Sequence, residues 1–203
     1  MNWRMATWMA TWVAAVVGLG GAGMGQQIRA PFEDELRQAV AEYRAGRFDG
    51  AREHTRKALA ILDEAKAGSV GDALPPAAEG WEAGEIAKED VPQFLGGGRT
   101  VKRLYQEKAG RKRLQLEVIF DAPMGKLLMG LLANDQMAEA QGFKVRRVGR
   151  ERALLKQSGD TIELNMPVED KLLVKLTGSG GAEEKDVLAL AREVDRAALK
   201  GLE

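Results

Sequence analysis

Cysteine is absent from this 203-residue chain, and histidine occurs only once, as His54. The lack of cysteine excludes disulfides, thiolate chemistry and a lipid-modified N-terminal cysteine. A zinc site would have to consist of carboxylates, which zinc seldom uses without histidine or cysteine. The paired acidic residues also lack the spacing of a calcium-binding loop. We therefore predict no metal site and no cofactor.

The chain has no excess of either charge, because 30 Lys and Arg residues balance 30 Asp and Glu residues. This balance argues against a nucleic-acid partner, since domains that bind nucleic acids are normally basic. Aromatic residues make up only 5% of the chain, and Trp81 is the one tryptophan after residue 12. Stacking platforms for bases or sugars are therefore poorly supplied.

Catalytic side chains are also scarce. The three serines lie in turn-like contexts rich in glycine, and none occupies a G-x-S-x-G setting. His54 stands among charged residues in a helical pattern, where an exposed surface histidine is expected. A hydrolase that relies on carboxylates has no spacing to support it. We predict no catalytic residue and a protein that is not an enzyme.

The N-terminus carries the most informative pattern in the chain. Arg4 precedes an uncharged run from Met5 to Gly25, and small residues crowd the end of this run. A positive start, an apolar stretch and a small-residue end are typical of a secretory signal peptide. We predict a signal peptide over residues 1–25 and an exported, periplasmic protein that is soluble after cleavage. The alternative is an uncleaved membrane anchor, which the length of the run allows and its glycine-rich second half disfavours.

Residues 26–68 are predicted to form a helical hairpin. Apolar residues recur at three- and four-residue spacing after Pro31, which suits a first helical position. Gly46 breaks the pattern, and a second helix is expected from Asp49 to Gly68.

The stretch AVAEYRAGRFDGAREHTRKALAIL in this hairpin resembles one tetratricopeptide (TPR) repeat. Small and aromatic residues stand where that family places them: Ala39, Tyr43, Gly46, Phe48, Ala51, Ala58 and Leu59. Glu42 departs from the pattern, because that position is usually aromatic. The chain has a single copy, whereas repeat solenoids need about three to bury a continuous core. The hairpin must therefore pack on the C-terminal domain or on another chain.

A segment rich in Gly, Pro and Ala over residues 69–80 predicts a linker. The domain that follows, residues 81–203, alternates apolar and polar residues as half-buried strands do. Strands are expected over 81–86, 100–107, 113–121, 143–148, 152–157, 161–166 and 171–177, with helices over 123–142 and after residue 182. This order predicts an α+β fold, with an antiparallel sheet of about six to seven strands backed by two helices.

The tracts GWEAGEI, KVRRVGRERALLK and TIELNMPVEDKLLVKLTGSG resemble a group of uncharacterised secreted bacterial proteins. The order of elements over residues 81–203 is similar to the Mog1/PsbP-like fold. That resemblance implies binding and assembly rather than catalysis, and it identifies no site residue.

Two groups of residues are candidate surfaces. The helix after Pro123 is apolar around more than half of its circumference, and methionine-rich surfaces adapt to varied partners. Its candidate contact residues are Met124, Leu127, Leu128, Met129, Leu131 and Leu132. A weaker candidate, for anionic groups such as lipid headgroups, consists of Arg111, Lys112, Arg146 and Arg147 at two hairpin tips. The alternatives are that the helix packs on the hairpin, and that the basic residues keep strand edges soluble.

The leading hypothesis is a non-enzymatic protein-binding or envelope-assembly module, whose partner is another envelope protein or a second copy. The alternative is a periplasmic carrier or sensor of a lipid or other apolar small molecule, bound between the sheet and the helices. A sizeable apolar cavity favours the carrier, and a fully packed core counts against it.

Overall fold

The computed structural model of the chain describes residues 22–90, 98–120, 124–169 and 172–202. The predicted signal peptide, residues 1–25, lies almost entirely outside these ranges. Within them, no helix is both long enough and apolar enough to cross a membrane. The chain divides into two compact units, Met1–Ile61 and Leu62–Glu203, and the boundary between them falls inside the second helix.

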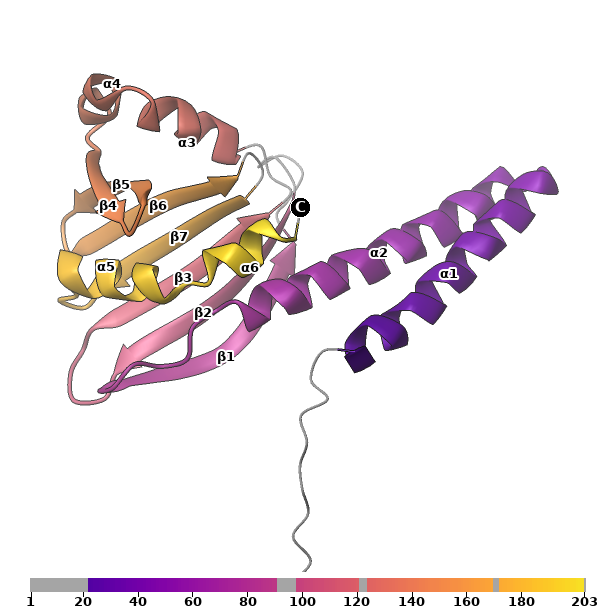
Figure 1. Cartoon of the computed structure of the whole chain (residues 1–203), viewed down its shortest axis with the longest axis horizontal. Coiled ribbons are helices and arrows are strands. Elements are labelled where there is room, and N and C mark those ends of the chain that lie inside the picture. Colours follow the sequence, from indigo (N-terminus) through magenta and orange to yellow (C-terminus); the bar gives the residue numbers. More distant parts are fainter. Residues whose placement is uncertain (1–21, 91–97, 121–123, 170–171, 203) are drawn as a thin grey trace, which may run out of the picture. The chain divides into compact units, whose positions relative to one another are not determined.

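The first unit is the predicted helical hairpin, made by α1 (Ala22–Arg44) and the first part of α2 (Phe48–Asp72) (Figure 1). Gly46 makes the turn with φ of +74°, a conformation that glycine adopts without strain. The buried residues between the helices are small, namely Ala39, Ala51 and Ala58. Small side chains let the two helices approach closely, but they bury little apolar surface.

Both helices are longer than their patterns predicted. α1 begins at Ala22, so Pro31 lies inside the helix, where it removes one backbone hydrogen bond. α2 continues through Gly68 to Asp72, and the first residues of the predicted linker are therefore helical. Glycine inside a helix costs about 1 kcal/mol relative to alanine. Val70 is fully buried in the core of the second unit, and burial of one such side chain contributes about 1.5–3 kcal/mol.

The second unit contains an antiparallel sheet of seven strands in the order β1-β2-β3-β7-β6-β5-β4, as Figure 1 shows. The strands are β1 (Trp81–Asp90), β2 (Arg99–Glu107), β3 (Arg113–Phe120), β4 (Lys144–Val148), β5 (Glu151–Ser158), β6 (Thr161–Glu169) and β7 (Leu172–Ser179). The predicted α+β fold is therefore confirmed. β1 is longer than predicted, because it pairs with β2 as far as Asp90 opposite Arg99.

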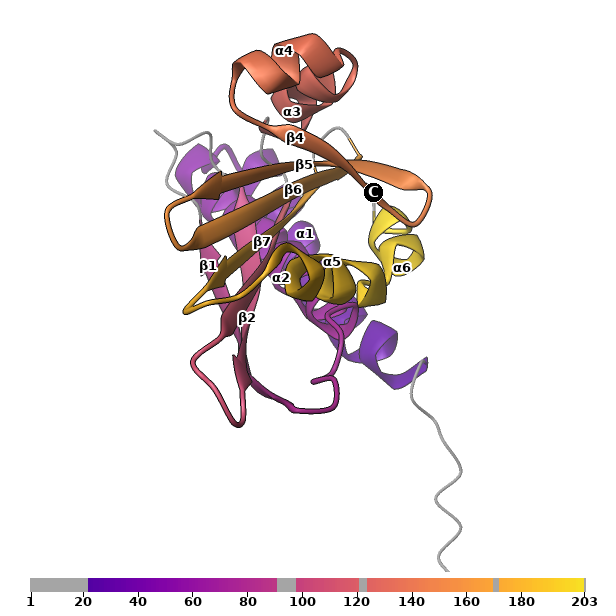
Figure 2. The same ribbon diagram turned by 90° about the vertical axis from the view of Figure 1, so that its left-hand side faces the viewer.

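Helices cover both faces of the sheet (Figure 2). One face packs on the last turns of α2, on α5 (Glu184–Glu193) and on α6 (Arg196–Lys200), and it carries the main core. The opposite face packs on α3 (Met124–Leu132) and α4 (Asp135–Ala140) around a smaller core. The helix predicted over 123–142 is thus two helices, because the Asn134 side chain accepts a hydrogen bond from the Met137 N–H and caps α4.

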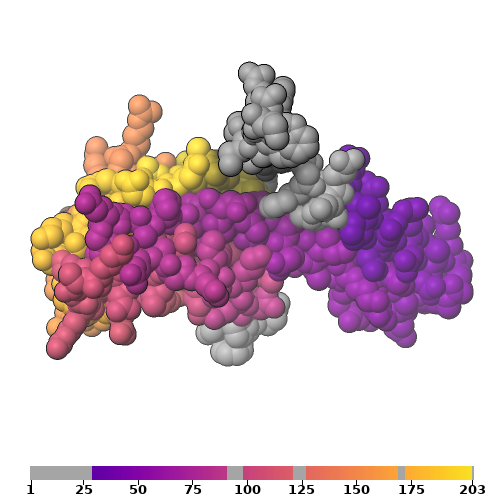
Figure 3. Space-filling view, turned by 90° about the horizontal axis from the view of Figure 1, so that it is seen from below, coloured from indigo at the N-terminus to yellow at the C-terminus, as the bar shows by residue number. Residues whose placement is uncertain are grey.

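The strand β1 forms one edge of the sheet, and Figure 3 shows it in magenta at the surface. Most of its residues are exposed, and half of them are charged. Its pairing with β2 also shifts register between Ala83 and Ile86. Charges and irregular pairing on an edge strand oppose pairing with a further strand, so this edge is a poor place for strand addition.

Candidate functional site

The predicted apolar surface of α3 is divided between packing and exposure. Leu128 and Leu132 are buried against Leu154 and Leu173 of the sheet, and Leu131 is half-buried beside them. Leu127 is 71% exposed and Met129 is 43% exposed. The side chain of Met124 lies outside the described part of the structure. The helix therefore uses one face to cover the sheet, and Leu127 and Met129 are the members that solvent reaches.

The four predicted basic residues are also divided. Lys112 donates a hydrogen bond of 2.9 Å to Asp186, and Arg146 donates to the carboxylate of Glu184. Both acidic residues belong to the first turn of α5, whose helix dipole favours negative charge. Arg111 and Arg147 are exposed. An anionic ligand would therefore have to compete with two ion pairs that attach α5 to the sheet.

The Asp186 carboxylate is the centre of this attachment. Burial opposes its ionisation, but the backbone N–H of Glu183 and the ammonium group of Lys112 hold the pKa of Asp186 below its usual range. The same carboxylate accepts a hydrogen bond of 2.8 Å from that N–H, which caps the start of α5. One ionised side chain thus both caps α5 and pairs with Lys112, beside the buried Val187, Leu190 and Ala191 that pack α5 on the sheet.

Beside Asp186 lies a partly open pocket of about 260 Å³. It is enclosed by the segment between α2 and β1, by the first three strands, and by one side of α5. Its lining residues are Pro75, Pro76, Ala77, Ala78, Trp81, Tyr105, Leu114, Asp186, Ala189, Leu190 and Glu193. Among these described residues two are acidic and none is basic. The pocket is therefore an apolar hollow with negative charge at its border.

One wall of this pocket is held in place by hydrogen bonds to the carbonyl oxygen of Pro75. The hydroxyl of Tyr105 donates to it at 2.7 Å, and Arg103 Nη1 donates to it at 3.2 Å. The Tyr105 ring is 1% exposed, and burial raises the pKa of its hydroxyl above the usual value. The proline-rich segment is thus fixed to β2 by the strand's own side chains.

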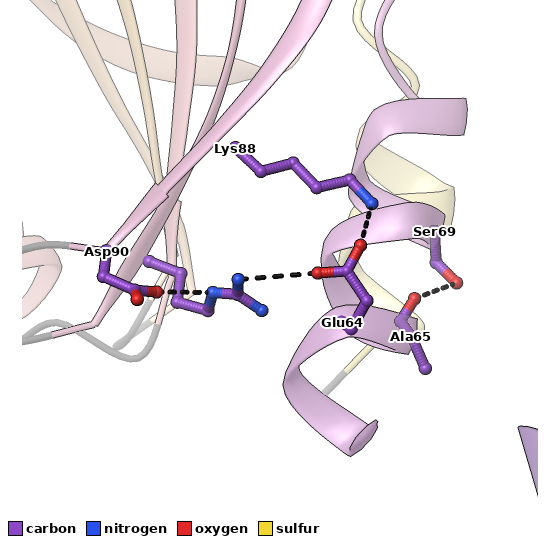
Figure 4. Close-up of polar contacts among 6 residues, drawn as sticks. Glu64, Ala65, Ser69, Lys88 and Asp90 are labelled. Atoms are coloured by element: carbon purple, nitrogen blue, oxygen red, sulfur yellow. Dashed lines mark hydrogen bonds and ion pairs between the residues drawn. The ribbon is translucent and has the colours of Figure 1, made fainter. Parts of the chain in front are cut away.

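The helix that leads into this segment is fixed by an ion-pair cluster (Figure 4). Lys88 of β1 donates to the carboxylate of Glu64 on α2, and Arg99 approaches the same carboxylate at 3.5 Å. Arg99 also donates to Asp90 at 2.8 Å. The hydrogen bond from Lys88 is the main reason that the pKa of Glu64 lies below its usual range. These contacts join α2 to β1 and β2 at the ends of the two strands that lie far from Trp81 and Tyr105.

The open part of the α3-side face carries a satisfied polar network rather than a site. Asn165 is buried and donates to Glu163 at 2.7 Å, while Lys175 pairs with the same carboxylate at 3.1 Å. In the described ranges, no buried side-chain nitrogen or oxygen lacks a hydrogen-bond partner. The same ranges contain no group of three or more side chains arranged to hold a metal ion.

His54 lies in the first unit, where its Nδ1 is 2.7 Å from a carboxylate oxygen of Glu35. Its side chain is 20% exposed, so it is half-buried between the helices rather than fully exposed as predicted. The reason is that Glu35 on α1 faces it across the hairpin. This histidine joins the two helices and has no serine beside it in the described structure.

Sequence reasoning missed the pocket. In the sequence Trp81 is an isolated tryptophan at the start of a predicted strand. Ala189 and Glu193 belong to the outer side of a helix whose prediction rests on its buried stripe. The available signal was local: a Pro75-Pro76 pair, which cannot continue a helix, followed shortly by a large aromatic residue. The contribution of α5 to the same hollow had no signal in the linear pattern.

No protein-family model and no curated protein matches the chain. Among solved structures, the chain is similar to a GTP-binding regulator from Thermotoga maritima, with 10% sequence identity and a TM-score of 0.40. The match covers 64% of this chain and 87% of that chain. A likeness this weak supports no inference about this chain. The resemblances to a TPR repeat and to the Mog1/PsbP-like fold therefore stay predictions.

Proposed function

We propose that the second unit is a non-enzymatic binding module that holds a small apolar group with a positively charged end in the pocket beside Trp81. The observation that carries this proposal is the pocket itself, which is apolar within, acidic at its border and about 260 Å³ in volume. The proposal follows the carrier or sensor alternative of the sequence analysis, because that alternative requires an apolar cavity between the sheet and a helix.

The volume of the pocket limits what it can hold. An apolar cavity of about 150 Å³ accommodates benzene, and pockets for drug-sized ligands begin at about 300 Å³. A pocket of about 260 Å³ therefore suits one aromatic ring or a short alkyl chain. It is too small for a whole membrane lipid, so the proposed ligand is a small molecule or the terminal group of a larger one.

The charge at the border selects the sign of the ligand. Asp186 is already neutralised by Lys112, whereas Glu193 is exposed and makes no ion pair with any residue that the structure describes. Trp81 and Tyr105 add aromatic surface, which attracts cations as well as apolar groups. An ammonium group of the ligand could form an ion pair with the Glu193 carboxylate, whereas a carboxylate of the ligand would be repelled by it.

Tryptophan fluorescence tests this proposal directly. Replacing Trp3, Trp8 and Trp12 by Phe leaves Trp81 as the only tryptophan in the full chain. We expect benzylammonium to change Trp81 emission with a lower dissociation constant than benzyl alcohol, and benzoate to bind most weakly. The three probes have nearly the same size, so their order reports charge alone. No emission change with any probe would contradict the proposal.

Two substitutions separate binding in the pocket from binding elsewhere. Ala189→Phe places a ring in the hollow and should abolish binding of every probe. Ala197→Phe is its matched control, because Ala197 is also an exposed helical alanine but does not line the pocket. Glu193→Gln should weaken benzylammonium several-fold and leave benzyl alcohol unchanged. Equal effects of the two phenylalanine variants would place the probes outside the pocket.

The place of action is a separate part of the proposal. The leader over residues 1–25 supports export to the periplasm, where a module without cysteine needs no disulfide formation. Fusion of these residues to a reporter that is active only after export tests this point. Activity that depends on the apolar run would support export, and an inactive fusion would contradict it.

A further inference from the structure

The first unit exposes apolar side chains along one stripe of α1. Leu36 is 39% exposed, Val40 is 48% exposed and Tyr43 is 65% exposed. The hairpin buries little beyond Ala39, Ala51 and Ala58 between its own helices. Because the residues buried between the two helices are alanines, the hairpin gains little from the hydrophobic effect, and a partner that covers this stripe would stabilise it.

The stripe has the shape that accepts another helix. A shallow hollow on α1 is lined by Leu36, Arg37, Val40, Ala41 and Arg44. Four of these residues, beginning at Arg37, follow the i, i+3, i+4, i+7 spacing of the hole that receives a side chain from a facing helix. The natural occupant of such a hollow is therefore an apolar side chain carried on a second helix.

The charges that flank the stripe are self-complementary. Glu33 and Arg44 are eleven residues apart, about three turns, and so lie on the same side of the helix. Glu33 bonds to Arg29 within the helix, and both side chains are more than half exposed. Arg44 makes no ion pair or hydrogen bond through its side chain with any part of the chain that the structure describes. A partner helix should thus present an acid opposite Arg44 and a base near Glu33.

We propose that a second copy of this chain docks on α1, with the two α1 helices antiparallel about a two-fold axis near residue 38. In this register Leu36 of each helix lies opposite Val40 of the other, and the four side chains form the centre. Glu33 of each copy comes within one residue of Arg44 of the other, so both ends of the contact gain an ion pair. A parallel arrangement would place like charges together, which fixes the orientation.

Sedimentation velocity of the full chain between 1 and 200 μM tests this dimer. Only α1 contributes to the contact, so we expect a small interface and a dissociation constant in the micromolar range or above. Glu33→Arg and Arg44→Glu should each weaken the dimer at least tenfold. The double variant E33R/R44E restores opposite charges across the axis and should recover the affinity to within about threefold.

Two further variants locate the contact. Val40→Glu places a charge at the centre and should leave only monomer, while circular dichroism checks that the helices remain. Leu127→Glu is the matched control, because this exposed leucine lies on α3 of the second unit, and it should leave the dissociation constant unchanged. A monomer at every concentration would overturn the proposal. The proposal would also be overturned if the single charge reversals left the dissociation constant of the dimer unchanged, or if the double variant did not restore it. None of these outcomes depends on the pocket.

Discussion

The hydroxyl group of Tyr105 offers a sharp test of how the pocket wall is held. Tyr105→Phe keeps the buried ring and removes only the hydrogen bond of 2.7 Å to the Pro75 carbonyl oxygen. A typical intramolecular hydrogen bond contributes about 0.5–1.5 kcal/mol net. Arg103 still donates to the same oxygen at 3.2 Å, so the substitution leaves no buried acceptor unsatisfied. We therefore expect a loss of about 1 kcal/mol in the free energy of unfolding, within that range.

The second tyrosine of the chain is its control. Tyr43 is 65% exposed and contacts the ring of Phe48, while its hydroxyl has no hydrogen-bond partner among the described residues. Tyr43→Phe should therefore change the free energy of unfolding by less than about 0.5 kcal/mol. Tyr105→Ala removes the buried ring as well and should cost about 3–5 kcal/mol, as for other large aromatic side chains.

Equilibrium unfolding in urea measures these differences, with circular dichroism as the reporter of both units. Trp81 emission reports the second unit alone when Trp3, Trp8 and Trp12 are replaced by Phe. At an m-value of about 2 kcal/mol/M, a loss of about 1 kcal/mol lowers the midpoint by about 0.5 M. The same m-value in both phenylalanine variants would show that the compactness of the two states is unchanged. If Tyr105→Phe and Tyr43→Phe unfold at the same midpoint, the hydrogen bond does not stabilise the wall, and the reasoning is refuted.

Four further predictions concern two titrating side chains, two leucines of α3 and two glycines with positive φ. Because burial raises the pKa of Tyr105, the unfolded chain loses the hydroxyl proton before the folded chain does as the pH rises above about 10. The free energy of unfolding should therefore decrease in this range, and Tyr105→Phe should remove the contribution of this proton to the decrease. Urea unfolding from pH 9 to 11 measures the difference. Because the pKa of Asp186 is lowered in the folded chain, its carboxylate stabilises the protein above the ordinary pKa of about 4, and this stabilisation disappears as the pH falls through the folded-state pKa. Asp186→Asn should therefore lower the free energy of unfolding at pH 7 and differ little from the parent at pH 2. An equal difference at both pH values would contradict this. Leu128→Ala should cost about 2–5 kcal/mol and Leu127→Ala less than about 0.5 kcal/mol in the same assay, and equal costs would contradict the described orientation of α3. Gly180→Ala should lower the melting temperature more than Gly159→Ala, because both have positive φ but only at Gly180 would a Cβ lie 2.1 Å from the Arg111 carbonyl oxygen.

Element types were predictable wherever one face of an element is buried. β3 is an example, since its Leu114, Leu116 and Val118 alternate with polar Gln115 and Glu117, and these three and Phe120 are the ones buried. Boundaries were less predictable, because they depend on contacts with distant residues. α2 passes through Gly68 since Ala67 and Val70 pack on the sheet, and local propensity does not contain that contact.

The candidate sites show the same division. The sequence predicted an apolar helix after Pro123, but the burial of Leu128 and the exposure of Leu127 depend on which side of α3 packs on β5, β6 and β7. Lys112 and Arg146 belong to a basic pattern in the sequence. In the folded chain their charges are balanced by Asp186 and Glu184 of α5.

The sequence by itself determined the α+β class, the helical hairpin and the seven strands, because the spacing of apolar residues along the chain shows which face of each element is buried. It also determined the absence of thiol chemistry, since no cysteine is present. Only the tertiary structure decided that Trp81, Tyr105 and Glu193 border one pocket. These residues come from β1, β2 and α5, and they meet because the sheet order and the anchoring of α5 bring distant segments together.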